Sequence, residues 1–223
     1  MFSNLAYSNQ WLYNMDAYKE TFETWNKVAQ IYEDKFMSLD LYNATYDNFC
    51  DLITKKNSRV LELGCGPGNI TKYIHSKRPD FRIDAIDVAP NMIELAKKNC
   101  PDVNCKVMDI RFVNQLPSDY DAIICGFGIP YISKAELTQL IADSNQLLNT
   151  SGIFYLSFVD GAYTDSGYQI GSSGDRTYFY YHSLVDVAKE LEKQRFKILH
   201  LLPVLYSRND DTKEVHTIII AKK

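Results

Sequence analysis

The chain has 223 residues, of which 46% are hydrophobic and 23% are charged, and its net charge is −4. This apolar content can support a buried core, so disorder over most of the chain is excluded. The longest aliphatic stretch, residues 218–221, is far too short to span a membrane. A slight acidic excess without a Lys/Arg-rich run argues against binding nucleic acid through its phosphates. We expect one α/β domain with neither a membrane nor a nucleic-acid partner.

The start of the chain and its cysteines indicate the compartment. Residues 1–16 contain no basic segment followed by an apolar one, so we expect no secretory signal and a cytoplasmic location. The five cysteines include no CxxC pair, and no His lies at zinc-binding spacing from them. We therefore expect free thiols and no metal site.

Two helical patterns come first along the chain. Apolar residues over 22–36 recur at spacings of three and four, which predicts an amphipathic helix. A second such pattern covers residues 39–53. We predict that residues 1–57 form an N-terminal helical cap on an α/β unit at 58–223, both within a single structural domain.

From residue 58 onward, short apolar runs alternate with helical patterns. This alternation predicts an α/β fold, a mostly parallel sheet with helices on both of its faces. Residues 133–136 match a capping box and predict the start of one of the helices. Strands are expected at 59–63, 81–87, 105–110, 120–125 and 152–159, and helices after Gly68, from Asn91 and from Lys134.

The last third of the chain predicts a long loop, a helix and a hairpin. Residues 160–176 are polar and rich in Gly and Ser, which predicts a long loop, either a lid or a disordered segment. A helix is expected from 183 to about 194. The apolar segments 196–206 and 214–223 then suit a terminal antiparallel hairpin. Pro203 predicts that the first of these strands lies at a sheet edge or is broken there.

A glycine loop follows the first predicted strand, which contains the acid Glu62. Its glycines allow the backbone to approach a ligand at a helix N-terminus. The spacing is GxGxG and not the GxGxxG of dinucleotide-binding loops. A carboxylate at Glu62 would repel a pyrophosphate and would favour an ammonium or sulfonium ligand. The pattern favours a methyl donor, with a nicotinamide oxidoreductase as the competing hypothesis.

Two further acids end the next two predicted strands. Asp87 is placed to accept hydrogen bonds from ribose hydroxyls, although a solvated loop acid or a helix cap is the alternative. Asp109 is placed to accept from an exocyclic adenine amine, with an ordinary turn Asp as the alternative. Ile110 would add a backbone N–H and an apolar wall. Met92 would line the adenine pocket or pack in the core.

Together these motifs resemble the class I S-adenosylmethionine-dependent methyltransferases. The resemblance rests on ELGCGPGN at 62–69, Asp87, MDI at 108–110 and YDAIICGFGIPYI at 120–132. It implies the Rossmann-like fold of that family, a seven-stranded mostly parallel sheet whose last strand is antiparallel, and S-adenosylmethionine as cofactor. It implies these cofactor-binding residues: Tyr32, Glu62, Gly64, Cys65, Gly66, Asp87, Val88, Met92, Asp109, Ile110 and Gly126.

The resemblance also implies a role for most of these residues. Glu62 and the backbone of the glycine loop would face the methionine end, Asp87 the ribose, and Asp109 with Ile110 the adenine. Gly126 would offer its carbonyl to the methionine amine. Tyr32 would close over the cofactor or would be a core aromatic residue.

The acceptor is less well defined by the sequence. Residues 126–131 (GFGIPY) depart from the Asn/Asp-Pro-Pro-aromatic motif of nucleic-acid amino methyltransferases. We therefore expect methyl transfer to an O or N atom of a small molecule by in-line displacement. An RNA or protein methyltransferase of the same fold, a nicotinamide oxidoreductase and a scaffold without turnover remain alternatives. The catalytic residues are not determined, and His182 and His216 are candidates for a general base.

Aromatic residues predict where the acceptor would bind. The N-terminal segment and residues 160–182 are both rich in aromatic side chains, which suit a small organic or cationic acceptor. The alternative is that they only cover the sheet edge. Arg176 would pair with an acceptor carboxylate or would be a surface charge. The aromatic candidates are Tyr7, Trp11, Tyr13, Tyr18, Tyr163, Tyr168, Tyr178, Tyr180 and Tyr181.

Overall fold

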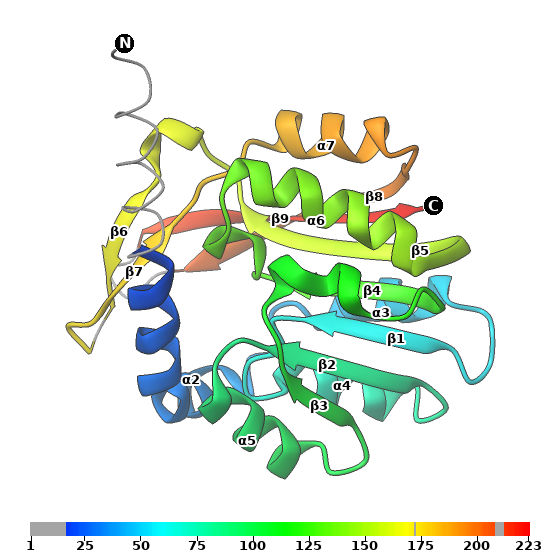
Figure 1. Cartoon of the computed structure of the whole chain (residues 1–223), viewed down its shortest axis with the longest axis horizontal. Helices are drawn as coiled ribbons and strands as arrows, with labels where there is room; N and C mark the ends of the chain where they lie inside the picture. Colours follow the sequence, from blue (N-terminus) through cyan, green and yellow to red (C-terminus); the bar gives the residue numbers. More distant parts are fainter. Residues whose placement is uncertain (1–16, 172, 208–211) are drawn as a thin grey trace.

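The computed structural model describes residues 17–171, 173–207 and 212–223. Their main feature is a seven-stranded sheet with the strand order β3-β2-β1-β4-β5-β9-β8 (Figure 1). Strand β9 runs antiparallel to both of its neighbours, and the other strand pairs are parallel. This confirms the predicted fold. The strands are β1 (Arg59–Leu63), β2 (Arg82–Asp87), β3 (Asn104–Val107), β4 (Tyr120–Gly126), β5 (Leu148–Val159), β8 (Lys197–Ser207) and β9 (Lys213–Lys222).

Helices cover both faces of the sheet because its strands bury side chains on both faces. Within β1, Val60 belongs to one hydrophobic cluster and its neighbour Leu61 to the other. The first cluster holds α3 (Asn43–Leu52), α4 (Asn69–Lys77) and α5 (Pro90–Asn99) against the sheet. The second holds η1 (Ile110–Gln115), α6 (Lys134–Leu147) and α7 (Leu184–Lys193). The short turn η2 covers Ile129–Tyr131.

The N-terminal part lies over one edge of this sheet. Residues 17–27 are helical, the helix is interrupted at Val28, and α2 continues over Ala29–Phe36. Ala29 of α2 packs against Ala89 and Met92 at the start of α5. The cap predicted for residues 1–57 is thus helical in its described part, and its boundary with the rest stays a prediction. The predicted aromatic residues Tyr7, Trp11 and Tyr13 lie outside the described residues.

The segment predicted as one long loop contains regular structure. It forms η3 (Tyr163–Asp165) and an antiparallel hairpin of β6 (Gly167–Ile170) and β7 (Arg176–Phe179). Tyr168 and Tyr178 face each other across the hairpin, with their ring centroids 5.2 Å apart. The loop prediction for residues 160–176 was wrong over β6 and at Arg176, because cross-strand aromatic pairing stabilises a hairpin that local Gly and Ser content does not indicate.

This hairpin is attached to the N-terminal helix. The Thr24 hydroxyl donates a 2.9 Å hydrogen bond to the Arg176 carbonyl, and the Tyr178 amide donates one of 2.9 Å to the Thr21 hydroxyl. Figure 1 shows β6, β7 and the blue helix together at the side of the sheet toward which β1 and β2 point. These segments therefore cover the carboxyl ends of the parallel strands, where ligands of open α/β sheets bind.

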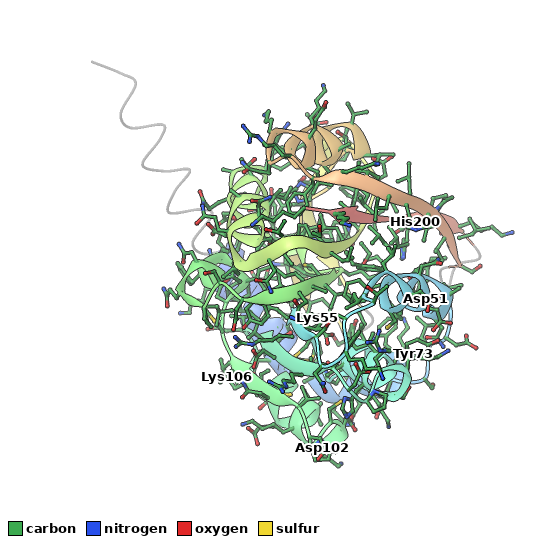
Figure 2. The ribbon with its side chains drawn as sticks, turned by 90° about the vertical axis from the view of Figure 1, so that its right-hand side faces the viewer. Asp51, Lys55, Tyr73, Asp102, Lys106 and His200 are labelled. Atoms are coloured by element: carbon green, nitrogen blue, oxygen red, sulfur yellow. The ribbon has the colours of Figure 1, made fainter. Side chains whose placement is uncertain are left out.

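The opposite side of the molecule carries charged side chains in water. Figure 2 shows Asp51, Lys55, Asp102 and Lys106 there, and all four are exposed. The Lys55 ammonium pairs with Asp121 at the start of β4 at 2.8 Å. No described helix has the length and apolar character needed to cross a membrane. The candidate site is therefore sought at the carboxyl ends of the strands.

Candidate functional site

The glycine loop joins β1 to α4 through three left-handed residues. Gly64, Gly66 and Gly68 have φ values of +70°, +54° and +89°, which glycine adopts without a steric cost. The Gly66 amide donates a 2.9 Å hydrogen bond to Oδ2 of Asp87 at the end of β2. A Cβ built on Gly66 would lie 3.7 Å from Cε1 of Tyr32. The loop is thus fixed between β2 and the ring of Tyr32.

The Asp87 carboxylate is held by backbone amides on both of its oxygens. Oδ2 accepts from Gly66, and Oδ1 accepts from the Ala89 amide at 2.8 Å. Burial raises the pKa of Asp87, while the amide hydrogen bonds favour its ionised form. A carboxylate oxygen has room for more than one donor, so each oxygen keeps a lone pair for a ligand hydroxyl.

A first cavity lies in front of this loop. It contains the carboxylates of Asp87 and Asp109, and among the described residues no Lys or Arg lines it. Trp25, Tyr131 and Phe22 add aromatic walls that were not predicted. Nine of the eleven predicted cofactor residues line this cavity: Tyr32, Gly64, Gly66, Asp87, Val88, Met92, Asp109, Ile110 and Gly126.

Asp109 is oriented by the residue two positions after it. Its Oδ1 accepts from the Arg111 amide at 2.9 Å, and its Oδ2 pairs with the Arg111 guanidinium at 2.6 Å. That guanidinium lies 4.2 Å from the centroid of the Tyr18 ring. The predicted adenine contact of Asp109 therefore depends on the oxygen lone pairs that Arg111 leaves available.

Glu62 lies behind the glycine loop and lines neither large cavity. Its side chain is fully buried, and its Oε2 accepts a 2.5 Å hydrogen bond from the Thr71 hydroxyl. Burial raises the pKa of Glu62 to about 8, so the carboxyl keeps its proton at neutral pH. Its Oε1 is buried without a partner among the described residues. The assignment of Glu62 to the cofactor stays a prediction, and the carboxylates that line the cavity are those of Asp87 and Asp109.

A second cavity adjoins the first and is mainly aromatic. The two share these lining residues: Trp25, Tyr32, Gly64, Gly66, Gly126, Phe127 and Tyr131. Cys65, a predicted cofactor residue, lines only the second cavity. Other rings around it belong to Phe36, Tyr42, Tyr46, Phe179, Tyr206 and His216. Its lining therefore suits a planar organic molecule next to whatever occupies the first cavity.

Most of the lining of this second cavity was missed by the sequence analysis. Only Gln169 and Phe179 come from the segment 160–182 that was expected to build the acceptor pocket. Tyr163 stacks on Tyr180 outside both large cavities. The reason is that the strands β8 and β9 and the start of α3 supply these walls, and such a tertiary arrangement leaves no local motif.

A signal for the missed Glu214 was present in the sequence. Glu214 and His216 are two positions apart on a predicted strand, so their side chains point to the same face. In the structure, Nε2 of His216 lies 2.9 Å from Oε1 of Glu214, and its Nδ1 lies 2.6 Å from the Tyr42 hydroxyl. The candidate His216 is therefore at the second cavity together with two polar partners.

The other candidate base, His182, lies elsewhere. Its Nε2 is 3.0 Å from the Ile129 carbonyl and 3.1 Å from that of Ile132, so this nitrogen is a donor. Burial lowers the pKa of His182. The ring borders a small separate cavity with Tyr163 and Lys134, and neither large one. We therefore assign His182 a structural role, because its ring links the segment at residue 182 to the loop after β4.

Arg176 and the cysteines also have structural surroundings. The Arg176 guanidinium pairs with Glu20 at 2.6 Å and lies 4.0 Å from the centroid of the Tyr168 ring. It does not line the second cavity. The five cysteines are buried free thiols. Within the described part of the chain, no cluster of His, Cys, Asp and Glu has the geometry to hold a metal ion.

Comparisons with known proteins agree with this architecture. Residues 60–152 match the family model described as "Methyltransferase domain". Methyltransferase 235L of Invertebrate iridescent virus 6 is 35% identical over 140 residues, which cover 62% of this chain and 50% of the viral protein. The chain therefore spans about half the length of this relative.

Solved structures show the same fold at low sequence identity. A methyltransferase of Methanosarcina mazei has a TM-score of 0.68 and 16% identity, and the match covers 78% of this chain and 96% of that one. The 1,6-didemethyltoxoflavin-N1-methyltransferase of Burkholderia thailandensis has a TM-score of 0.67 and 15% identity, with 96% and 89% covered. Residues 60–152 therefore match a methyltransferase domain, and the chain has the Rossmann-like fold and strand order of its methyltransferase neighbours.

Proposed function

We propose that the first cavity binds S-adenosylmethionine and that its methyl group passes to an O or N atom of a small molecule in the second cavity. One observation carries this proposal. Two carboxylates and no described Lys or Arg line a cavity at the glycine loop, and an aromatic cavity adjoins it. A cationic nucleoside fits such a lining, whereas the pyrophosphate of a nicotinamide dinucleotide would meet Asp87 and Asp109.

The residues of the first cavity suit the parts of this cofactor. Asp87 would accept from the ribose hydroxyls, since both of its oxygens are aimed by the amides of Gly66 and Ala89. Asp109 and Ile110 would take the adenine, and the backbone of the loop the methionine end. Gly126 would offer its carbonyl to the methionine amine. Tyr32, Trp25 and Tyr131 would exclude water from the reaction centre.

The bound sulfonium would supply an electrophilic methyl carbon. The protein's contribution is then to place the acceptor atom about 3 Å from that carbon, opposite the sulfur. The boundary between the two cavities is the place for this reaction, because Gly64, Gly66 and Phe127 line both. A buried aromatic site favours a small acceptor over an RNA or protein, and the structural neighbour from Burkholderia thailandensis is named for a small heterocycle.

Calorimetry with S-adenosylhomocysteine tests the cofactor assignment. We expect micromolar affinity, about −8 kcal/mol, and no measurable binding of NAD⁺ or NADH. Release of S-adenosylhomocysteine from S-adenosylmethionine in the presence of small aromatic acceptors would then test methyl transfer. Binding of NAD⁺ with no response to S-adenosylhomocysteine would contradict the proposal. The cytoplasmic location stays a prediction that cell fractionation would test.

A further inference from the structure

Three polar side chains form a hydrogen-bonded chain along one wall of the second cavity. The Tyr42 hydroxyl lies 2.6 Å from Nδ1 of His216, and Nε2 of His216 lies 2.9 Å from Oε1 of Glu214. All three residues line the cavity, and Tyr42 and His216 are each 7% exposed. Tyr42 caps the start of α3, whereas the other two residues lie on β9. The chain of hydrogen bonds therefore depends on the tertiary fold.

The positions of the hydrogens in these hydrogen bonds follow from the Glu214 carboxylate. The Glu214 oxygen accepts from His216, so Nε2 of His216 carries a hydrogen, and Nδ1 keeps a lone pair. The Tyr42 hydroxyl then donates to Nδ1. Both nitrogens of the His216 ring already have hydrogen-bond partners, so a molecule in the cavity would reach His216 through the Tyr42 oxygen. Burial raises the pKa of Tyr42, so its own hydroxyl stays protonated at rest.

Packing places the chain of hydrogen bonds beside the proposed reaction centre. The His216 ring is stacked between Tyr42 and Tyr206, at centroid distances of 5.9 and 4.8 Å. The edge of Phe127 contacts the His216 ring at 4.9 Å and the Tyr42 ring at 5.3 Å. Phe127 follows Gly126 at the end of β4, has a left-handed φ of +57° and lines both cavities. Only one aromatic ring therefore separates His216 from the first cavity.

The charge of the second cavity restricts its ligand. Among the residues described, its lining includes the Glu214 carboxylate and no Lys or Arg. An anionic ligand would lose its hydration there without gaining a cationic partner from these described residues, which is costly. A neutral or cationic aromatic molecule loses less, and its ring meets the faces of several aromatic side chains.

We propose that Tyr42, His216 and Glu214 are a proton relay that removes a proton from the acceptor, and that the acceptor is an aromatic molecule with a hydroxyl or ring N–H and no carboxylate. This inference rests on the proposed function of the two cavities. The acceptor's proton passes to the Tyr42 oxygen while the Tyr42 proton passes to Nδ1 of His216. The electron pair left on the acceptor atom forms the bond to the methyl carbon, and the S–CH₃ bond breaks with its pair on sulfur. Glu214 balances the positive charge on His216, which later returns its proton to water.

A coloured phenol tests the relay without knowledge of the natural acceptor. The 4-nitrophenol anion absorbs visible light and the neutral form does not, so its absorbance reports the proton. We expect 4-nitrophenol to bind the protein saturated with S-adenosylhomocysteine, with its pKa lowered by about one unit or more relative to free solution. We expect 4-nitrobenzoate, the matched carboxylate, to bind at least about tenfold more weakly.

Two variants and one control assign the shift to the relay. In Tyr42→Phe and His216→Gln, we expect the pKa shift of bound 4-nitrophenol to disappear. Affinity for S-adenosylhomocysteine should stay within about twofold, which also shows that the variants are folded. Tyr73→Phe is the control, because it removes a hydroxyl that bonds Asp47 away from both large cavities (Figure 2).

The outcomes separate this inference from the proposed function. No binding of 4-nitrophenol, an unchanged pKa in the bound phenol, or tighter binding of 4-nitrobenzoate would overturn the inference while S-adenosylhomocysteine still binds. A shift that survives in both Tyr42→Phe and His216→Gln would also overturn the relay. Absence of S-adenosylhomocysteine binding would instead overturn the proposed function, and this inference with it.

Discussion

The two adjoining cavities differ in how the sequence encodes them. The first is built around one local motif, the glycine loop after β1, together with Asp87 at the end of β2 and Asp109 just after β3. The second is assembled from the start of α3, the loop after β4 and the strands β8 and β9, which are far apart in the chain. We conclude that the proposed cofactor cavity is specified locally, while the proposed acceptor cavity depends on the global fold. The two cavities should therefore respond separately to substitution.

Replacement of the relay histidine is expected to have the largest effect. In His216→Gln, kcat for an acceptor that supports turnover should fall about 100-fold or more, because general bases contribute on that scale. Affinity for S-adenosylhomocysteine should stay nearly unchanged, since His216 does not line the first cavity. Steady-state kinetics and calorimetry measure the two quantities. An equal loss in both would show that the cavities are not separable.

Asp87→Ala should give the reverse pattern. It removes the carboxylate that Gly66 and Ala89 orient, so we expect affinity for S-adenosylhomocysteine to fall at least about tenfold. Binding of 4-nitrophenol alone should change little, because Asp87 does not line the second cavity. Asp102→Ala is the matched control, since this carboxylate is exposed on the opposite side (Figure 2). Equal affinities in Asp87→Ala and the control would remove Asp87 from the site.

The raised pKa of Glu62 predicts that the stability difference between the original protein and Glu62→Gln depends on pH. Its pKa is about 8 in the folded protein and about 4.5 in the unfolded chain, so the stability it contributes is present at low pH and is lost as the pH rises through about 8. Glu62→Gln stays neutral, so we expect it to unfold like the original protein near pH ~5 and to be more stable by roughly 1–3 kcal/mol near pH ~9. Thermal unfolding across this range measures the difference.

The control for that experiment is Glu192→Gln, whose carboxyl is exposed on α7. Its stability difference from the original protein should not vary in the same way with pH. A Glu62→Gln curve parallel to that of the original protein at all pH values would show that Glu62 is already ionised in the folded state. In that case the Glu62 charge would contribute to the cavity directly, as the glycine-loop motif first indicated.

The smallest effect is expected from the ion pair that joins the hairpin to the N-terminal helix. The Glu20 and Arg176 side chains are 37% and 51% exposed, and exposed pairs contribute little. Glu20→Gln should therefore change the melting temperature by less than about 2 °C. A much larger drop in differential scanning calorimetry would show that this pair controls the position of the hairpin.

The sequence predicted what depends on local pattern. The seven-stranded, mostly parallel sheet and its antiparallel last strand followed from the α/β alternation and the family resemblance, and both are confirmed. The capping box at Ser133 and Glu136 is present, because its hydrogen bonds need only four consecutive residues. The hairpin of β6 and β7 was missed, since its stability comes from aromatic pairing across strands and from contacts with the N-terminal helix.

The residues of the candidate site also fall into two groups, those that a local motif indicates and those that only the tertiary fold brings together. Residues that touch the glycine loop, such as Asp87 and Tyr32, were named from motif and spacing, and the structure brings them to one cavity. The charge state of Glu62 could not be read from its type, because burial sets it. Tyr42 and Glu214 carry no motif, and only folding places them against His216. His182 has the right chemistry but a position between two backbone carbonyls.

A crystal structure of the protein with S-adenosylhomocysteine tests the central claim most directly. We predict the nucleoside in the first cavity, with ribose hydroxyls in hydrogen-bond distance of Asp87 and the sulfur directed toward the second cavity at Phe127. A dinucleotide bound in that cavity, or the nucleoside found elsewhere on the molecule, would contradict the account.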